Sequence, residues 1–153
     1  MTDLNDPQAV ASACAESLWQ DDRTSKKLGM KIVRVAPGEA ELSMTVTEDM
    51  VNGHNIGHGG YLFTLADSTF AFACNTYNQR CVAQHCTISF LAPVHAGEQL
   101  RSSAKEISRQ GRNGIYDITV FDSQGKVVVE FRGYSRTIKG CLLYTSPSPR
   151  DRG

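Results

Sequence analysis

The sequence predicts an α+β domain in which one antiparallel sheet covers a single long helix. Three observations support this prediction. Residues 61–74 are apolar on nearly every side, as expected for a helix buried from several directions. A hairpin pattern precedes this segment, and long strand-like segments joined by short turns follow it, which favours an antiparallel meander. The chain has 153 residues, which suits one domain with a sizeable core.

Two helices and a hairpin are expected before the buried helix. Asp6-Pro7 supplies an N-cap acid and a proline at the first helical position, and apolar residues then recur at helical spacing. A second short helical turn is predicted over 22–28. Strands over 30–35 and 40–46 should pair across the turn at Pro37-Gly38.

A loop rich in glycine and asparagine over 52–60 should lead into the buried helix, which should end near Asn78. The rest of the domain reads as strands separated by glycine-containing turns. The predicted strands are residues 81–91, 99–110, 115–121 and 127–138.

Charge and composition exclude several functions. Sixteen basic residues balance sixteen acidic ones, so the chain lacks the positive surface that nucleic-acid binding requires. No apolar stretch approaches the roughly 20 residues that span a bilayer, and the acidic N-terminus does not resemble a signal peptide. We therefore expect a cytoplasmic protein that does not insert into a membrane. The five scattered cysteines indicate reduced thiols, and their spacing predicts no metal site.

The C-terminal segment differs from the rest of the chain. Residues 141–153 contain two Ser-Pro pairs and end in charged residues, a composition typical of disorder. The segment resembles translated read-through of sequencing-adapter DNA. We therefore predict a domain over residues 1–140 and a disordered, non-native tail over 141–153.

The stretch from Asn52 to Asp67 is the most informative about chemistry. Gly59 and Gly60 stand at the start of the helix, where backbone N–H groups lack helical partners and carry partial positive charge. Such N–H groups can stabilise an oxyanion. No Gly-Lys-Ser/Thr sequence follows, so the loop is not a phosphate-binding P-loop.

Asp67 lies two helical turns further on, within the apolar run. A carboxylate there must be desolvated, and it would be a good general base or nucleophile. The alternative is a hydrogen-bonded structural aspartate. His58 and Asn52 likewise read either as site residues or as a helix cap and a turn former.

The spacing of Gly59 and Asp67 has a further consequence. Eight residues of helix separate them by about 12 Å, too far for both to reach one carbonyl group. A second copy of the chain can bring the two groups together. The sequence therefore predicts a dimer with shared sites.

The order Asn52-Gly53-His54, His58-Gly59-Gly60 and Leu65-Ala66-Asp67 resembles the signature of hotdog-fold acyl-CoA thioesterases. The resemblance is greatest to the thioesterases of phenylacetic acid degradation, and it covers residues 15 to 140. Further matching segments are residues 70–75, 86–93, 114–118 and 131–135.

The resemblance implies a hotdog fold, a homodimer that pairs into a homotetramer, and hydrolysis of an acyl-CoA thioester. It implies that Asp67 attacks the carbonyl or activates water, and that the Gly59 N–H polarises that carbonyl from the opposite subunit. His58 and Asn52 match positions that support the reacting groups. No cofactor or metal is implied, because coenzyme A is part of the substrate.

Some relatives place a hydroxyl on the strand after the helix. Gln84 and His85 are the candidates on that strand here, and Gly60 is a candidate for substrate binding beside Gly59. Arg112, with Arg109, Arg132 and Arg136, is a candidate for the coenzyme A phosphates, although each arginine can equally be a solvated cation. Two other functions stay open: a hotdog-fold hydratase or dehydratase, and a non-catalytic acyl-CoA-binding module.

Overall fold

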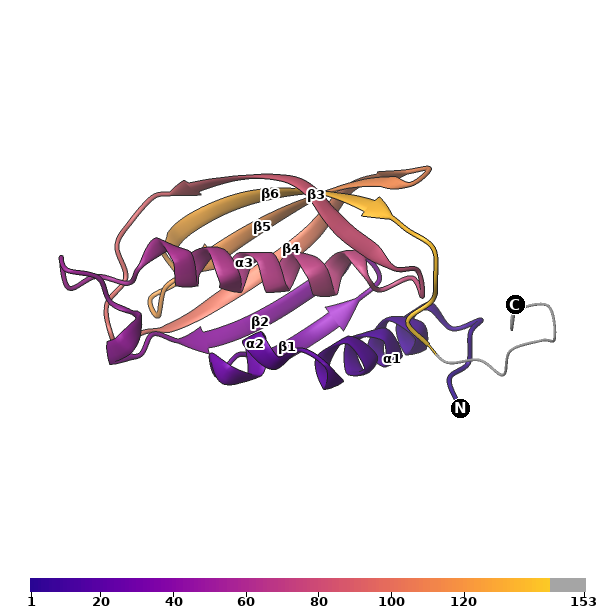
Figure 1. The fold of residues 1–153 in the computed structure, drawn as a ribbon, viewed down its shortest axis with the longest axis horizontal. Helices are drawn as coiled ribbons and strands as arrows, with labels where there is room; N and C mark the ends of the chain where they lie inside the picture. The colour runs from indigo at the N-terminus through magenta and orange to yellow at the C-terminus, as the bar shows by residue number, and fades with distance from the viewer. Residues whose placement is uncertain (144–153) are drawn as a thin grey trace.

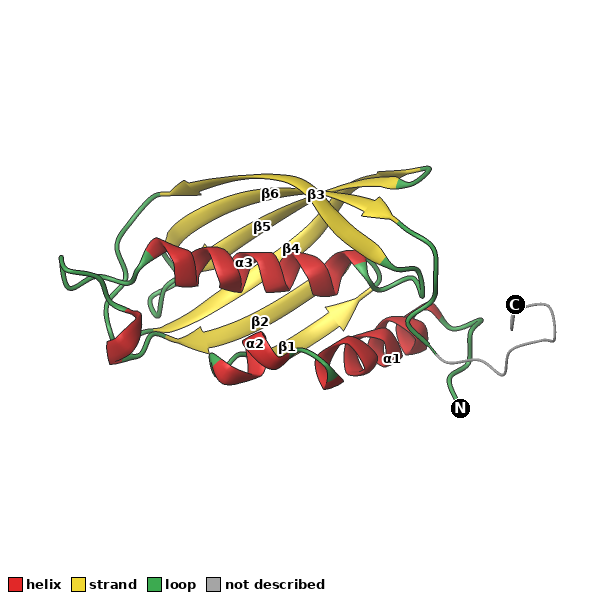
Figure 2. Ribbon diagram, in the orientation of Figure 1, coloured by secondary structure: helices red, strands yellow, loops and turns green. Residues whose placement is uncertain are grey.

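The computed structural model describes residues 1–143, and in it one long helix lies against one face of a single curved sheet (Figures 1 and 2). The predicted tail from 144 onward lies outside the described residues. The elements in chain order are α1 (Pro7–Gln20), α2 (Arg23–Lys27), β1 (Lys31–Ala36), β2 (Glu39–Thr45), a 3₁₀ turn (Glu48–Met50), α3 (Gly59–Cys74), β3 (Cys81–Phe90), β4 (Gln99–Gln110), β5 (Asn113–Phe121) and β6 (Val127–Thr137).

Local sequence signals determine where α1 and α2 begin. Asp6 accepts hydrogen bonds from the backbone N–H groups of Gln8 and Ala9, and Pro7 is the first residue of α1. Asp22 caps α2 by accepting the Ser25 N–H at 2.9 Å. Both helices occur where the sequence predicts them.

The six strands form one antiparallel sheet in the order β1-β2-β4-β5-β6-β3. The predicted meander is correct for β4, β5 and β6 but wrong for β3. Strand β3 pairs with β6, with Cys81 opposite Thr137, while β4 pairs with β2, with Ala104 opposite Ala40. The eight residues of 91–98 between β3 and β4 are too many for a tight hairpin, and they carry the chain from the edge strand β3 to the interior strand β4.

The inner side of α3 packs closely on the sheet. The Phe70 ring contacts the rings of Tyr116 and Phe131, with centroids 5.7 and 6.0 Å away. A Cβ added at Gly133 of β6 would lie 2.8 Å from the Phe70 ring. The helix can approach β6 this closely because residue 133 has no side chain.

The outer side of α3 is its least buried side, whereas the sequence predicted burial from several directions. Figure 1 views this side, which no strand covers. Thr64, Asp67 and Ala71 are only half-buried, whereas Leu62, Leu65 and Ala66 are buried. A stripe along the helix that includes Asp67 therefore faces outward.

The ends of α3 also differ slightly from the prediction. The helix includes both glycines, and its C-cap is Asn75 rather than Asn78. Asn78 has a positive φ of 56°, so it belongs to the turn that leads into β3.

The first residues of the predicted tail contact the domain. The hydroxyl of Ser17 donates to the Leu142 carbonyl at 2.9 Å, and the Leu143 N–H donates to Asn78 Oδ1 at 2.9 Å. Within residues 1–143, no helix has the length and apolar character needed to cross a bilayer.

Candidate active site

The N-terminus of α3 holds three of the predicted site residues. The Nδ1 atom of His58 accepts the N–H of Gly60 at 3.0 Å, so the His58 side chain caps the helix. Because Nδ1 acts as an acceptor, the neutral His58 ring carries its proton on Nε2. The Gly59 N–H donates to no acceptor among residues 1–143. It is therefore available to a ligand.

Asn52 shapes the loop before the helix. Its Oδ1 accepts the N–H groups of His54 at 2.9 Å and Ile56 at 3.4 Å. Its backbone N–H donates to the Ile56 carbonyl at 2.8 Å. The Asn52 side chain is thus a turn former, as one of the two sequence interpretations proposed, while its Nδ2 donates to no described residue.

Two grooves flank the start of α3. The first, which we call the Gly59 groove, has a volume of about 430 Å³ and is lined by Asn52, Ile56, Gly57, Gly59, Leu62, Phe90, Leu91, Ala92 and Pro93. The second, the Tyr61 groove, has a volume of about 620 Å³ and is lined by Thr24, Lys27, Leu28, Asp49, Val51, His58, Gly60, Tyr61 and Thr64. Both volumes lie within the range of small-molecule sites.

Asp67 lies about 12 Å further along α3 at helical rise. Burial raises the pKa of its carboxyl group, and the carboxylate accepts no hydrogen bond from any described residue. It lies near β3, because after burial the Asp67 charge is the second cause that raises the pKa of the Cys86 thiol. The structural alternative for Asp67 required hydrogen-bond partners, and residues 1–143 of one protomer do not supply them.

The other candidates on β3 lie away from Gly59. Gln84 sits at a bulge in β3, where its Nε2 donates to Asn113 Oδ1 at 3.1 Å and to the Ser135 carbonyl at 3.2 Å. His85 is exposed and contacts the Tyr134 ring, with centroids 5.3 Å apart. Within one protomer, neither side chain meets the Gly59 groove.

The arginines differ in how they are held. Arg112 is exposed in the β4–β5 turn, where its carbonyl accepts the Thr137 N–H at 2.7 Å, near the C-terminal end of α3. Arg109 stacks over the Tyr77 ring at 3.6 Å, and Arg132 forms a two-pronged pair with Asp117 at 2.6 and 2.8 Å. Arg109 and Arg132 thus have contacts within the sheet and its adjoining turn.

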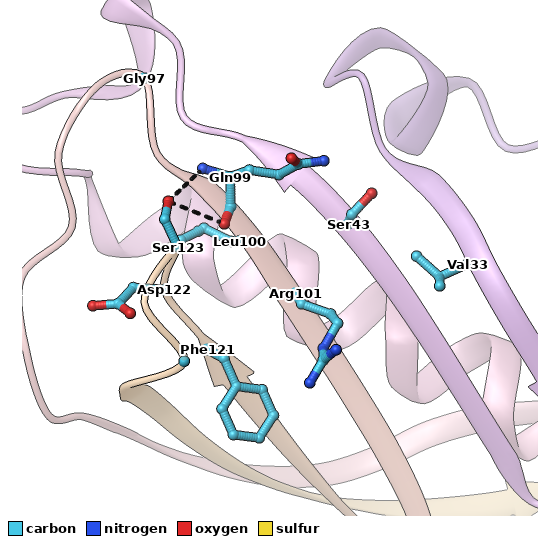
Figure 3. Close-up of a pocket in the computed structure, with 10 residues that line it drawn as sticks. Val33, Ser43, Gly97, Gln99, Leu100, Arg101, Phe121, Asp122 and Ser123 are labelled. Atoms are coloured by element: carbon cyan, nitrogen blue, oxygen red, sulfur yellow. Dashed lines mark hydrogen bonds between the residues drawn. The ribbon is translucent and has the colours of Figure 1, made fainter.

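A further hollow lies on the face of the sheet turned away from α3 (Figure 3). Its lining includes Val33, Ser43 and Arg101, and the Arg101 guanidinium lies 5.5 Å from the centroid of the Phe121 ring. None of the predicted site residues lines this hollow.

The sequence analysis missed two features of the site. The Phe90 ring lies beside Gly59, where an added Cβ would come within 3.2 Å of it. The Ser25 hydroxyl lies 2.9 Å from the Ser68 hydroxyl and donates to Asp22 at 2.7 Å, which joins α2 to α3 beside Asp67. Only the apolar end of the predicted 81–91 strand hinted at Phe90, and no local pattern predicts the serine contact.

The donor set does not suggest a metal centre. Among residues 1–143, no three His, Cys, Asp or Glu side chains come together in a way that could hold a metal ion. The arrangement instead offers a free backbone N–H at a helix start and a desolvated carboxylate. These two groups suit acyl transfer to water.

This fold and site define a hotdog-fold thioesterase, and the chain belongs to the thioesterase superfamily, whose family model matches residues 54–129. The chain is 43% identical over 129 residues to the acyl-coenzyme A thioesterase PaaI of Escherichia coli, covering 84% of this chain and 91% of that protein.

Solved structures show the same relationship. The structure of the Escherichia coli PaaI protein from the phenylacetic acid degradation operon matches with a TM-score of 0.87 at 40% identity, covering 89% of this chain and 99% of that chain. A mutant of the phenylacetic acid degradation protein PaaI from Thermus thermophilus matches with a TM-score of 0.74 at 35% identity, covering 76% of this chain and 100% of that chain.

Proposed function

We propose that this protein hydrolyses acyl-CoA thioesters, with Asp67 as the base or nucleophile and the Gly59 N–H as the oxyanion donor. The observation that carries the proposal is the free Gly59 N–H at the start of α3, in a groove of about 430 Å³. The desolvated carboxylate of Asp67 on the same helix supplies the second group that the reaction needs.

In the general-base route, Asp67 takes a proton from water as the water oxygen attacks the thioester carbon. The carbonyl oxygen becomes negative and accepts the Gly59 N–H, an interaction worth about 3–4 kcal/mol in the transition state. The C–S bond then breaks, the thiolate of coenzyme A takes the proton from Asp67, and the free acid forms. A positioned general base accelerates such a reaction by about 10²–10⁴-fold.

His58 supports this chemistry from the helix cap. Its Nδ1 accepts the Gly60 N–H, so the Gly59 N–H is the donor that stays free for the substrate carbonyl. Its Nε2 side is exposed and can donate to the substrate. The free Nδ2 of Asn52 can do the same from the loop that lines the Gly59 groove.

The active site forms between two copies of the chain in this proposal. Two antiparallel copies of α3 related by a two-fold axis would set Gly59 of one copy opposite Asp67 of the other, with two equivalent sites. The outward stripe of α3 and the exposed side chains of Val82, Phe90 and Leu91 on and beside the edge strand β3 support this contact. Pairing of dimers into a tetramer rests on the family resemblance, and a cytoplasmic location stays a prediction.

We propose an aryl-acetyl group as the preferred acyl group. Phe90 lines the Gly59 groove with 52% of its surface exposed, and Tyr61 lines the neighbouring groove. Phe70 and Phe72, two other aromatic residues of α3, are buried core residues. The naming of two relatives after phenylacetic acid degradation agrees with this choice.

The test is thiol release from phenylacetyl-, hydroxyphenylacetyl-, benzoyl- and straight-chain acyl-CoA. Asp67→Asn should fold but hydrolyse its best substrate at least about 100-fold more slowly. Glu48→Gln, which removes an exposed negative charge that lines neither groove, is the matched control and should keep activity. Near wild-type turnover by Asp67→Asn would contradict the assignment of Asp67. Hydration of an enoyl-CoA without thiol release would show that the protein is a hydratase and not a thioesterase.

Complementation tests the shared site. Gly59→Pro removes the N–H, whereas Gly59→Ala keeps it and only crowds the Phe90 ring. Asp67→Asn and Gly59→Pro should each be inactive alone, and mixed dimers should recover one site. Circular dichroism must first show that Gly59→Pro folds. Demonstrated subunit exchange without recovery of activity would contradict the shared site.

A further inference from the structure

Two cysteines meet at the end of the domain opposite the Gly59 groove. Cys74 is the last residue of α3, Cys81 is the first residue of β3, and residues 75–80 turn the chain between them. The Cys74 thiol donates to the Ala71 carbonyl at 3.6 Å, and the Cys81 sulfur lies 3.4 Å from the Thr137 hydroxyl. Cys74 is 2% exposed, whereas Cys81 is half-buried, so solvent reaches one sulfur and not the other.

The Asn75 side chain holds the two cysteines together. Its Oδ1 accepts the Cys81 N–H at 2.9 Å, and its Nδ2 donates to the Cys81 carbonyl at 3.2 Å. The same Nδ2 lies 3.6 Å from Cys74 Sγ. One amide therefore fixes the backbone of Cys81 beside the side chain of Cys74.

The surroundings of the two sulfurs make them chemically different. The Cys74 thiol lowers the pKa of Cys81 to about 6, against an opposing effect of burial, and the Thr137 hydroxyl at 3.4 Å and the Arg109 charge add to the lowering. The neighbouring Cys81 and burial raise the pKa of Cys74 well above its ordinary value. Burial is the first cause that raises the pKa of Cys14 and Cys86.

We propose that Cys81 and Cys74 form a site of oxidation by hydroperoxides, in which Cys81 reacts first and Cys74 closes a disulfide. The Cys81 thiolate attacks the terminal peroxide oxygen, the O–O bond breaks, and the leaving hydroxide or alkoxide takes a proton. The product is Cys81 sulfenic acid and water or an alcohol. The Cys74 sulfur then attacks the Cys81 sulfur, and a second water leaves.

The pairing of a half-exposed thiolate with a neighbouring resolving thiol is the arrangement that favours reversible oxidation over further oxidation. A thiol reductant returns both cysteines to the starting state. The proposal does not depend on thioester hydrolysis, because the site involves none of the groups assigned to that reaction.

The experiment uses the full chain with Cys141→Ser, so that the exposed Cys141 cannot exchange with other cysteines. The protein is reduced, treated with hydrogen peroxide near pH 7, and alkylated with N-ethylmaleimide. Trypsin cleaves after Arg80 and next after Arg101, so Cys74 lies on one peptide, and Cys81 and Cys86 share the following one. Fragmentation of the joined peptide locates the disulfide, because a bond to Cys81 leaves Cys86 alkylated. We expect this joined peptide to form before any other oxidised product, while Cys14 and Cys86 are recovered in the alkylated form. Before alkylation, the intact protein should be two hydrogen atoms lighter than the reduced chain.

Two variants separate the roles of the cysteines. Cys74→Ser should leave a Cys81 sulfenic acid that a cyclic 1,3-diketone traps, and Cys81→Ser should yield neither the trapped product nor the disulfide. Thr137→Val, which removes a hydroxyl but keeps the shape, should slow alkylation of Cys81 by iodoacetamide near pH 7. The proposal is overturned if the chain with Cys74 and Cys81 intact forms no joined peptide, or if Cys86 is oxidised as fast as Cys81. That readout needs no substitution at Cys74 or Cys81.

Discussion

The Nδ1 atom of His58 accepts the N–H of Gly60 at 3.0 Å, while the N–H of Gly59, one residue earlier, has no acceptor within residues 1–143. A single side chain therefore satisfies one of the open donors at the start of α3 and leaves the neighbouring donor free. This division lets the helix be capped and still offer an N–H to a ligand.

The cap predicts a difference between two His58 variants. His58→Ala removes the acceptor and should lower the free energy of unfolding by about 1 kcal/mol, the usual cost of losing an N-cap. His58→Asn supplies a side-chain oxygen at the cap and should recover most of this loss. Chemical denaturation of both variants measures the effect, and equal stability of His58→Ala and wild type would show that the cap contributes nothing.

Asp67 should reduce stability at neutral pH. Burial raises the pKa of its carboxyl group in the folded state above the ordinary value of 3.8, so the unfolded chain ionises first as the pH rises. The protonated carboxyl group therefore carries no penalty for folding below pH 3.8. As the pH rises above this value, the cost of burying the charge lowers the free energy of unfolding. Asp67→Asn should melt at a higher temperature than wild type at pH 7.

The difference in melting temperature between Asp67→Asn and wild type should disappear as the pH falls toward 3.8. Melting temperatures are compared at one protein concentration, because self-association also shifts them. Glu48→Gln is the control for a lost surface charge and should show no comparable gap. A gap that does not change with pH would show that the Asp67 charge is not its cause.

Glu106 should stabilise the end of the sheet through two tyrosines. Its Oε1 accepts the hydroxyls of Tyr77 and Tyr116, each at 2.9 Å, and Tyr116 is 1% exposed. Glu106→Ala leaves the buried Tyr116 hydroxyl without a partner and should cost about 1–3 kcal/mol of unfolding free energy. Glu106→Gln keeps an oxygen acceptor and should cost less. Urea denaturation compares the two, and equal losses would show that the hydrogen bonds are not the cause.

The tail should have two parts with different effects on stability. Deletion of residues 144–153 should leave the melting temperature and thioesterase activity unchanged. Deletion from Cys141 also removes Leu142 and Leu143, which contact Ser17 and Asn78, and should cost about 1–2 kcal/mol at the usual value of a hydrogen bond. Differential scanning calorimetry of the two truncations measures the difference. Equal melting temperatures would mean that the contacts of residues 142–143 do not contribute to stability.

The sequence predicted the elements of the fold because their signals are local. The acid and proline at Asp6-Pro7 determine the start of α1, and the apolar run after Gly60 identifies α3. The partner of β3 depends instead on how the connection at 91–98 passes the end of the helix, which no local pattern encodes. The strand order was therefore the part of the fold that could not be predicted from the sequence.

The candidate site could be proposed from the sequence for the same reason, because most of its residues stand close together in the chain. Asn52, His58, Gly59, Gly60 and Asp67 lie within sixteen consecutive residues, so one motif carries them. Phe90 and the Ser25–Ser68 contact reach the site from other elements and depend on tertiary packing. Within one protomer, Gln84, His85 and Arg112 stay apart from Gly59, and their role in substrate binding stays a prediction.

The pairing of β3 with β6 also determines when the protein can fold during synthesis. Cys81 and Thr137 are 56 residues apart in sequence, yet they lie opposite each other in the sheet. A nascent chain that has emerged only as far as β5 holds α3 without the β6 strand on which Phe70 rests, and β3 has no partner. Closure of so long a loop is slow, and it must wait for almost the whole domain. We therefore expect the chain to leave the ribosome with its central helix still unsheltered and to fold in one late, cooperative step.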